Sequence, residues 1–147
     1  MMAKKAAVSA CLLGRNCRYN GEIKENKEAI EKLKRAGCEI VEFCPEEACF
    51  GTPREAMDLT LTPEGVKALT KFTKEDRTTP VADYAETFFT QNPDIDLFVG
   101  KARSPSCGVR TARLYDEEGN LISEKESGIM AAEAKVRGIE AVDDENL

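Results

Sequence analysis

Three cysteines of this 147-residue sequence each come after a short apolar run, and this spacing is the first indication of chemistry. The runs and the cysteines that follow them are 6–10 with Cys11, 40–43 with Cys44, and 95–100 with Cys107. Such runs, bounded by polar, Pro or Gly residues, are typical of buried strands. If the three strands are parallel neighbours, the thiols converge at the carboxyl edge of one sheet, where α/β proteins bind their ligands.

The side chains available for catalysis exclude several common mechanisms. The sequence contains six cysteines and no histidine, so Ser-His and Cys-His nucleophiles and histidine-containing zinc motifs are ruled out. Three thiolates without imidazole suit an iron–sulfur cluster or a zinc ion. In a 4Fe-4S cluster, three protein ligands leave one iron open, and that iron is a Lewis acid for a small molecule. Cys17 and Cys49 lie in the same loops as Cys11 and Cys44, and either could be a fourth ligand.

The bulk composition predicts a soluble cytoplasmic protein. The sequence is 41% hydrophobic and 33% charged, which is typical of a globular domain rather than a disordered segment. The apolar stretch after Lys4 and Lys5 is too short for the core of a signal peptide. A net charge of −6, with no basic block, argues against nucleic acid as a partner. In a cytoplasmic chain the cysteines are expected to remain reduced, and Cys38, which precedes the second strand, is expected to be a small core residue.

The elements that must position the cysteines predict an α/β fold. Strands alternate with helices, which indicates a single domain over 1–147, built as a three-layer, Rossmann-like sandwich around a parallel sheet. Two β-hairpins, 58–70 and 111–122, interrupt this alternation and are expected to be small insertions. A glycine-rich dinucleotide fingerprint and a phosphate-binding loop are both absent, so nucleotide-dependent chemistry is disfavoured.

Capping residues predict where the helices begin and end. Asn26 is expected to cap the first helix, with Gly37 just after its last turn. Thr79 followed by Pro80 predicts the start of a second helix, and Ser127 predicts the start of the last. The segment 44–54, rich in Pro and Gly, is expected to be a loop.

Several short motifs, taken together, resemble the signature of a known family. The motifs are Ser9-Ala10-Cys11-Leu12-Leu13-Gly14, Cys17-Arg18-Tyr19-Asn20-Gly21, Cys44-Pro45-Glu46, Thr52-Pro53-Arg54 and Ser104-Pro105-Ser106-Cys107-Gly108. In this order they are similar to the 2-thiouracil desulfidases, formerly a family of unknown function. The resemblance covers nearly the whole chain. It differs at Ala48-Cys49-Phe50-Gly51, where many members have Gly-Gly-Leu, and at Asn20, where Asp is common.

The resemblance implies a function and a set of site residues. Members hold a 4Fe-4S cluster by three cysteines, which match Cys11, Cys44 and Cys107. Their catalytic glutamate and serine match Glu46 and Ser104. The implied reaction removes sulfur from a thiolated pyrimidine by hydrolysis and releases hydrogen sulfide without net redox change. The remaining motif residues are expected to bind the substrate: Arg18, Tyr19, Asn20, Thr52, Arg54 and Ser106.

Two other functions remain open at this point. One is a non-enzymatic iron–sulfur or metal carrier or sensor, in which Cys17 or Cys49 supplies a fourth ligand. The other is a zinc-dependent hydrolase built on the same thiolates. For the desulfidase we expect a small thiolated base as the partner, no membrane contact, and a monomer or weak homodimer.

Overall fold

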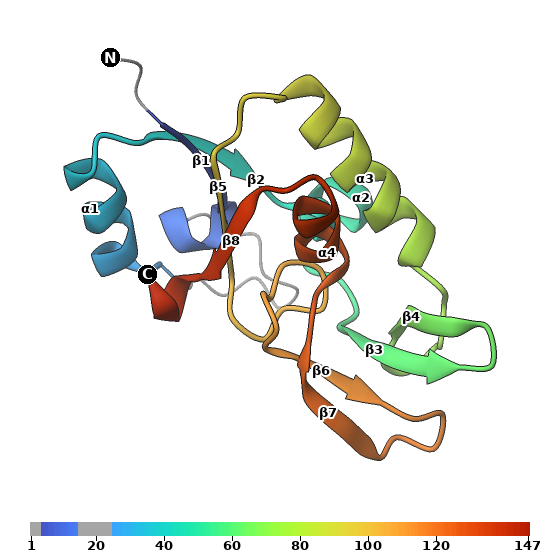
Figure 1. Cartoon of the computed structure of the whole chain (residues 1–147). Helices are drawn as coiled ribbons and strands as arrows, with labels where there is room; N and C mark the ends of the chain where they lie inside the picture. The colour runs from blue at the N-terminus through green and yellow to red at the C-terminus, as the bar shows by residue number, and fades with distance from the viewer. Residues whose placement is uncertain (1–3, 15–24) are drawn as a thin grey trace.

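The computed structural model describes residues 4–14 and 25–147, which form two four-stranded sheets and four α-helices. The first sheet, sheet A, has the strand order β2 (Glu39–Phe43), β1 (Lys5–Ser9), β5 (Leu97–Gly100) and β8 (Glu140–Asp143). Each pair of neighbouring strands in sheet A is parallel. The strands that precede the three candidate cysteines are therefore adjacent, as predicted, and their carboxyl ends meet at one edge (Figure 1).

Helices cover both faces of sheet A and complete the predicted three layers. Helix α1 (Lys27–Arg35) packs against the face that carries Val8, whereas α3 (Thr78–Gln91) and α4 (Ile129–Val136) pack against the face that carries Phe98. In Figure 1, α1 lies on one side of the sheet and α3 and α4 lie on the other. The alternation of inward positions along β1 explains this arrangement, because a strand buried on both faces directs successive side chains into two cores.

The two hairpins join into a second sheet, sheet B, which the sequence did not predict. The first hairpin consists of β3 (Met57–Thr62) and β4 (Gly65–Thr70), and the second of β6 (Ala112–Tyr115) and β7 (Leu121–Glu126). Strands β3 and β6 pair in parallel, so that sheet B has the order β4-β3-β6-β7. Its apolar face packs against Val81 of α3.

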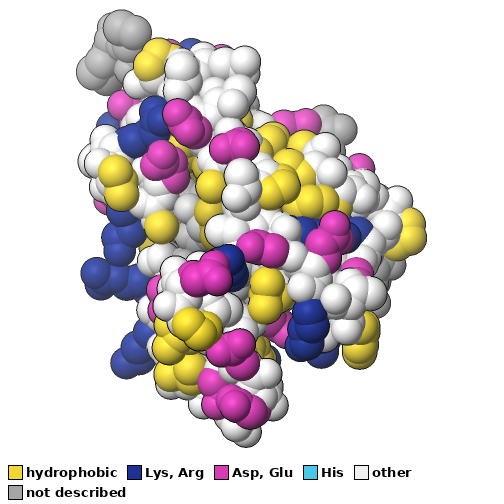
Figure 2. Space-filling view, turned by 90° about the vertical axis from the view of Figure 1, so that its right-hand side faces the viewer, with side chains coloured by type: hydrophobic (Ala, Val, Ile, Leu, Met, Phe, Trp, Pro, Cys, Tyr) yellow, Lys and Arg dark blue, Asp and Glu magenta, His cyan; other side chains and the backbone are white. Residues whose placement is uncertain are grey.

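The far ends of sheet B extend beyond this packing. The large apolar residues that remain exposed on the hairpins are Leu61, Val66, Leu121 and Ile122. Figure 2 shows the side of the molecule that includes the hairpins, where apolar side chains form small groups between acidic and basic ones. None of the helices in the described part of the chain is long and apolar enough to cross a membrane.

The helix ends agree with the sequence at α1 but not at α3 or α4. The Ala29 amide donates to the Asn26 side chain at 3.1 Å, as predicted for α1. Helix α3 begins at Thr78 rather than after Thr79, and the Thr78 amide donates to the Asp76 carboxylate at 3.0 Å. The residue that precedes α4 is Gly128, not the predicted Ser127. A β-carbon at position 128 would lie 2.5 Å from the Ser106 backbone, so this close contact requires glycine.

A short helix replaces part of the loop predicted after β2. Helix α2 covers Pro45–Phe50, with Cys44 as the residue before its first turn and Gly51 after its last. Proline is favoured in the first turn of a helix because its missing amide is not needed there. Two 3-10 helices follow strands of sheet A, Ala10–Leu13 after β1 and Asp144–Asn146 after β8. The three segments place side chains directly beyond the carboxyl edge of sheet A.

Candidate active site

A cavity of about 470 Å³ lies beyond the carboxyl edge of sheet A and is closed on one side by sheet B. All three predicted ligands, Cys11, Cys44 and Cys107, line it. They reach it from three different strand ends, so the cavity depends on the parallel register of β2, β1 and β5. Loops at this edge commonly carry function, because the sheet supports them without burying them.

Cys11 and Cys44 are each held by a neighbouring hydroxyl group. Cys11 lies in the 3-10 helix that follows β1, where its Sγ is 3.3 Å from the Ser9 Oγ in a buried contact. The Cys44 amide donates to the Tyr84 Oη of α3 at 3.2 Å. This bond ties the start of α2 to α3.

Cys107 is buried in the loop 101–110, which we call the Cys107 loop. The loop begins at Gly100, where any β-carbon would overlap the Cys107 carbonyl oxygen. Only glycine therefore allows the loop to fold back over the end of β5.

The amides at the start of helix α4 hold the Cys107 loop by the carbonyl groups of the loop. The Met130 amide donates to the Ser106 carbonyl at 2.7 Å, and the Ile129 amide donates to the Pro105 carbonyl at 3.1 Å. The Gly128 amide donates to the Gly108 carbonyl at 2.8 Å. The first amides of a helix have no partner within the helix, so the loop and α4 satisfy each other.

The C-terminal acidic segment holds the same loop by its amides. Asp144 Oδ1 accepts a hydrogen bond from the Ala102 amide at 2.9 Å, and Asp143 Oδ1 accepts one from the Val109 amide at 2.7 Å. Glu145 forms a paired contact with the Arg103 guanidinium group at 2.6 and 3.0 Å. No local feature of the sequence indicated that this acidic segment contacts the loop.

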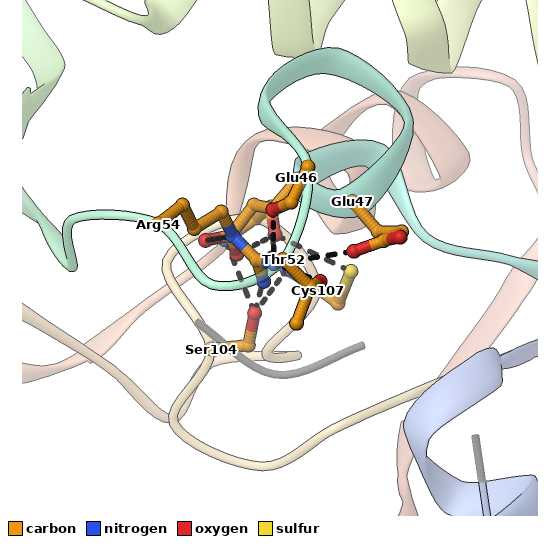
Figure 3. A network of polar contacts seen from close by, with 8 residues as sticks. Glu46, Glu47, Thr52, Arg54, Ser104 and Cys107 are labelled. Carbon is orange, nitrogen blue, oxygen red and sulfur yellow. Dashed lines mark hydrogen bonds and ion pairs between the residues drawn. The ribbon is translucent and has the colours of Figure 1, made fainter. Parts of the chain in front are cut away.

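The predicted catalytic residues are connected by a chain of hydrogen bonds (Figure 3). Ser106 Oγ donates to Glu46 Oε2 at 2.7 Å and lies 3.2 Å from Ser104 Oγ. Glu46 comes from the first turn of α2, and both serines come from the Cys107 loop. The structure thus brings Glu46 and Ser104 into one network through Ser106, although 58 residues separate them in the sequence (104 − 46).

Arg54 holds Glu46 from the opposite side. Its Nε lies 3.6 Å from Glu46 Oε1, and its side chain is only 6% exposed. Its Nη1 donates to the Gly51 carbonyl at 3.0 Å and to Thr52 Oγ1 at 3.1 Å. A second, longer ion pair of 3.8 Å joins Arg54 to Glu47. The guanidinium group therefore compensates the charge of the Glu46 carboxylate where little water reaches it.

The six residues predicted to bind substrate fall into three groups. Arg54 and Ser106 line the cavity, although both are largely engaged by other protein groups. Thr52 contacts Arg54 and does not belong to the described lining. The other three, Arg18, Tyr19 and Asn20, lie outside the described residues.

Burial controls the ionisation of the groups around the thiols. Desolvation raises the pKa of Cys107 well above its ordinary value, and the nearby Glu46, Cys44 and Cys11 raise it further, while the hydrogen-bond contact with Ser106 opposes the shift. Desolvation also raises the pKa of Tyr84. A buried thiol of this kind remains protonated until a metal replaces its proton.

The donor set fits an iron–sulfur cluster better than a single metal ion. Among the described residues, no three Cys, Asp or Glu side chains are arranged to hold one ion, so the zinc alternative finds no support there. Cys11, Cys44 and Cys107 line one cavity, and thiolates are the usual ligands of iron–sulfur clusters. The five described cysteines form no disulfide with one another.

The other two described cysteines lie away from the cavity. Cys49 is exposed, and its Sγ donates to the Pro80 carbonyl at 3.6 Å. Desolvation and the nearby Asp83 and Cys44 raise its pKa. Cys38 packs, partly buried, against the core beneath α1, in agreement with its predicted structural role.

Sheet B contributes a wall of the cavity that sequence reasoning missed. Met57, Leu59 and Tyr115 of sheet B line the cavity. Four basic residues also line it: Lys71, Lys101, Arg103 and Arg113. Two of these cations are paired with carboxylates, Arg103 with Glu145 and Arg113 with Glu124. The alternation of apolar residues along the hairpins indicated a buried face, but the sequence did not show that the pair of hairpins would face the cysteines.

Two comparisons with known proteins found a match. The model of the 2-thiouracil desulfurase family matches residues 6–146. A solved structure described as a [4Fe-4S]-dependent thiouracil desulfidase, TudS (DUF523Vcz), superimposes with a TM-score of 0.77. Its sequence is 29% identical, and the alignment covers 98% of this chain and 93% of TudS. No curated protein matches the chain.

Proposed function

Because the chain belongs to the 2-thiouracil desulfurase family, we propose that it is a 4Fe-4S-dependent desulfidase that hydrolyses a small thiolated pyrimidine. The family and the TudS neighbour indicate a desulfidase. The observation that carries the finer proposal is one cavity lined by Cys11, Cys44 and Cys107 together with the linked pair Glu46 and Ser104. This combination supplies soft metal ligands and a proton acceptor at the same place.

The three cysteines would hold the cluster. They come from three separate strand ends and line one cavity, so they suit a group with several irons. When bound, a cluster with three protein ligands supplies an open Lewis-acidic iron that polarises a carbon–sulfur bond. Arg54 and the apolar residues of sheet B line the same cavity and would restrict the space left for a substrate.

The chain's own residues provide the proton transfers. Glu46 accepts a proton from the attacking water, because its carboxylate lies at the cavity and is 13% exposed. Ser104, which is partly buried at the cavity, donates a proton to the leaving sulfur. Arg54 limits the motion of Glu46 through its ion pair. The carbon–sulfur bond is replaced by a carbon–oxygen bond, water supplies both protons of hydrogen sulfide, and no electron is transferred overall.

The non-enzymatic alternative requires a fourth cysteine ligand. Of the described cysteines, Cys38 and Cys49 both lie outside the cavity lining. The Cys49 thiol is directed to the Pro80 carbonyl of α3 instead. Cys17, the other candidate for a fourth ligand, lies outside the described residues, so this contact argues only against Cys49 in that role.

Anaerobic reconstitution followed by a sulfide-release assay tests the proposal. We expect about four irons per chain, as for one cube, together with hydrogen sulfide and uracil from 2-thiouracil in equal amounts. Glu46→Gln should keep the iron and lose the activity, which separates catalysis from cluster binding. A colourless protein that contains only zinc, or a brown one that releases no sulfide from any thiolated pyrimidine, would contradict the proposal.

A further inference from the structure

Ser106 occupies the position in the site where the predicted catalytic groups and a predicted ligand meet. Its Oγ donates to Glu46 Oε2 at 2.7 Å, and lies 3.2 Å from Ser104 Oγ and 3.5 Å from Cys107 Sγ. Ser106 is only 1% exposed. A hydroxyl group has one hydrogen and two lone pairs, and these contacts use them within the protein. Ser106 therefore has little capacity left to bind a substrate.

The hydrogen bonds of Ser104 determine the direction of the network. Ser104 Oγ accepts hydrogen bonds from the Ser106 amide at 3.3 Å and from the Cys107 amide at 3.1 Å. These two bonds occupy its acceptor capacity, so its single hydrogen must be donated. The available acceptor in this network is Ser106 Oγ, which in turn donates to Glu46. The hydrogens thus point from Ser104 through Ser106 to the carboxylate.

At the other end of the network, both carboxylate oxygens of Glu46 have a partner. Glu46 Oε1 faces Arg54 Nε at 3.6 Å, while Oε2 accepts from Ser106. Arg54 is itself fixed by the Gly51 carbonyl and Thr52. Glu46 and Ser104 are therefore joined through Ser106.

We propose that Ser106 is a proton-relay residue that returns a proton from Glu46 to Ser104 in each turnover, an inference that rests on the proposed desulfidase function. After the carbon–sulfur bond breaks, Glu46 carries a proton taken from water and Ser104 has lost one to the leaving sulfur. The Glu46 proton moves to Ser106 Oγ while the Ser106 proton moves to Ser104 Oγ. Both catalytic groups regain their starting state, and no oxidant or reductant is needed.

The relay assigns Ser106 a role different from the substrate contact predicted for it. A binding residue acts mainly on KM, whereas a relay acts on kcat because it serves steps after binding. Ser106 acts through Glu46 and Ser104, so the two serines should behave as one unit in mutagenesis. Losses from residues that act as a unit do not add.

The test compares reconstituted parent, Ser106→Ala, Ser104→Ala and the double variant. Ser106→Ala should lower kcat about 100-fold, the scale of a lost acid–base contribution. Iron content, and the affinity for 2-thiouracil measured from the spectral change of the bound cluster, should stay within about twofold of the parent, since the Ser106 hydroxyl is engaged by Ser104 and Glu46. The double variant should be no slower than Ser104→Ala alone. Ser106→Thr keeps the hydroxyl group, and its kcat should be at least about tenfold higher than that of Ser106→Ala.

Ser9 offers a matched control for the hydroxyl–thiol contact. Its Oγ touches Cys11 Sγ at 3.3 Å, much as Ser106 touches Cys107, and it has no part in the path from Ser104 to Glu46. The losses of kcat in Ser9→Ala and in Ser104→Ala should therefore multiply in the double variant. If that pair is as non-additive as the Ser106 pair, the relay is contradicted.

The outcomes distinguish a failure of the relay from a failure of the proposed desulfidase function. A parent enzyme that releases no sulfide overturns the desulfidase proposal, and the relay with it. An active parent together with a Ser106→Ala variant of unchanged kcat, or with a raised KM alone, overturns the relay and leaves the desulfidase intact. Multiplicative losses for Ser104→Ala and Ser106→Ala also overturn it.

Discussion

The two segments that supply the catalytic pair are held in place by different kinds of contact. The Cys107 loop, which carries Ser104, is fixed mainly through its backbone: its carbonyl groups accept from the first turn of α4, and its amides donate to the acidic C-terminal segment. The segment 44–54, which carries Glu46, is held mainly by the side chains of Tyr84 and Arg54.

This difference indicates where each segment is vulnerable. A segment anchored by one side chain can lose its position through a single substitution. A loop anchored by many backbone hydrogen bonds tolerates the loss of any one of them, but it tolerates no added volume where another backbone passes close by. We therefore expect the segment 44–54 to depend on Arg54 and the Cys107 loop to depend on its glycine contacts.

The largest contrast is expected between the cysteines of the two segments. Cys107→Ser should reduce the iron content from about four per chain to near zero, because it removes a thiolate ligand. Cys49→Ser, in the exposed part of the segment 44–54, should keep the iron because its thiol lies outside the cavity lining. Iron and sulfide analysis after anaerobic reconstitution measures both. Loss of iron in Cys49→Ser would show that the segment closes over the cluster.

Arg54→Met should be the next most damaging change. It retains an apolar stem but leaves the Glu46 carboxylate without its buried partner, which costs about 3 kcal/mol in unfolding free energy. Thr52→Ala removes only one hydrogen bond to Arg54 and should cost about 1 kcal/mol. Urea denaturation compares the two variants with the parent. Equal losses would mean that Arg54 does not anchor the segment.

Gly128→Ala tests the backbone contacts of the Cys107 loop. The new β-carbon would lie 2.5 Å from the Ser106 carbonyl carbon and 2.6 Å from the Cys107 amide nitrogen, so α4 and the loop must separate. We expect a loss of about 2 kcal/mol from overpacking, together with weaker iron binding. In Gly119→Ala, where nothing lies within 4 Å and only a positive φ of 87° is strained, iron binding should be unchanged. Normal iron binding in Gly128→Ala would contradict the proposed rigidity of the loop.

The smallest effect concerns Asp143 and depends on pH. Burial raises the pKa of Asp143 above its ordinary value, and repulsion from Asp144 and Glu145 adds to the shift. A carboxyl group whose pKa is raised by folding contributes stability at low pH, and this contribution is lost as the pH rises through its folded-state pKa. Asp143→Asn, which can still accept from Val109, should therefore raise the urea midpoint at pH 7 and leave it unchanged near pH 3. A lower midpoint at pH 7 would show that the loop needs the charged acceptor.

Local patterns were sufficient for much of the fold and for the convergence of the site. Short apolar runs that end at cysteines predicted the strands, and the alternation with helices predicted that they are parallel. Together these patterns predict that Cys11, Cys44 and Cys107 meet at one edge, as the structure shows. The resemblance implied Glu46 and Ser104, and the structure joins them in one network. Their catalytic and ligand roles stay predictions.

Features that depend on distant contacts were not predicted or were predicted wrongly. The segment after β2 was expected to be a loop, but Pro45–Phe50 is helical. The start of α4 shifts by one residue because Ser106 and Gly128 pack backbone against backbone. The start of α3 moves because Asp76, rather than Thr79, accepts from the Thr78 amide. In each case the deciding contact was not visible in the local pattern.

The sequence by itself determined which residue types could do chemistry and at which strand ends they lie, because strand periodicity and chain order are local properties. Only the tertiary structure decided that the two hairpins join into one sheet beside the cysteines, since β3 and β6 pair although Leu59 and Leu114 are 55 positions apart (114 − 59). It also decided that the acidic C-terminal residues hold the Cys107 loop and that Ser106 faces Glu46. Such contacts join groups far apart in the chain, and their partners are selected by the packing of the whole fold rather than by neighbouring residues.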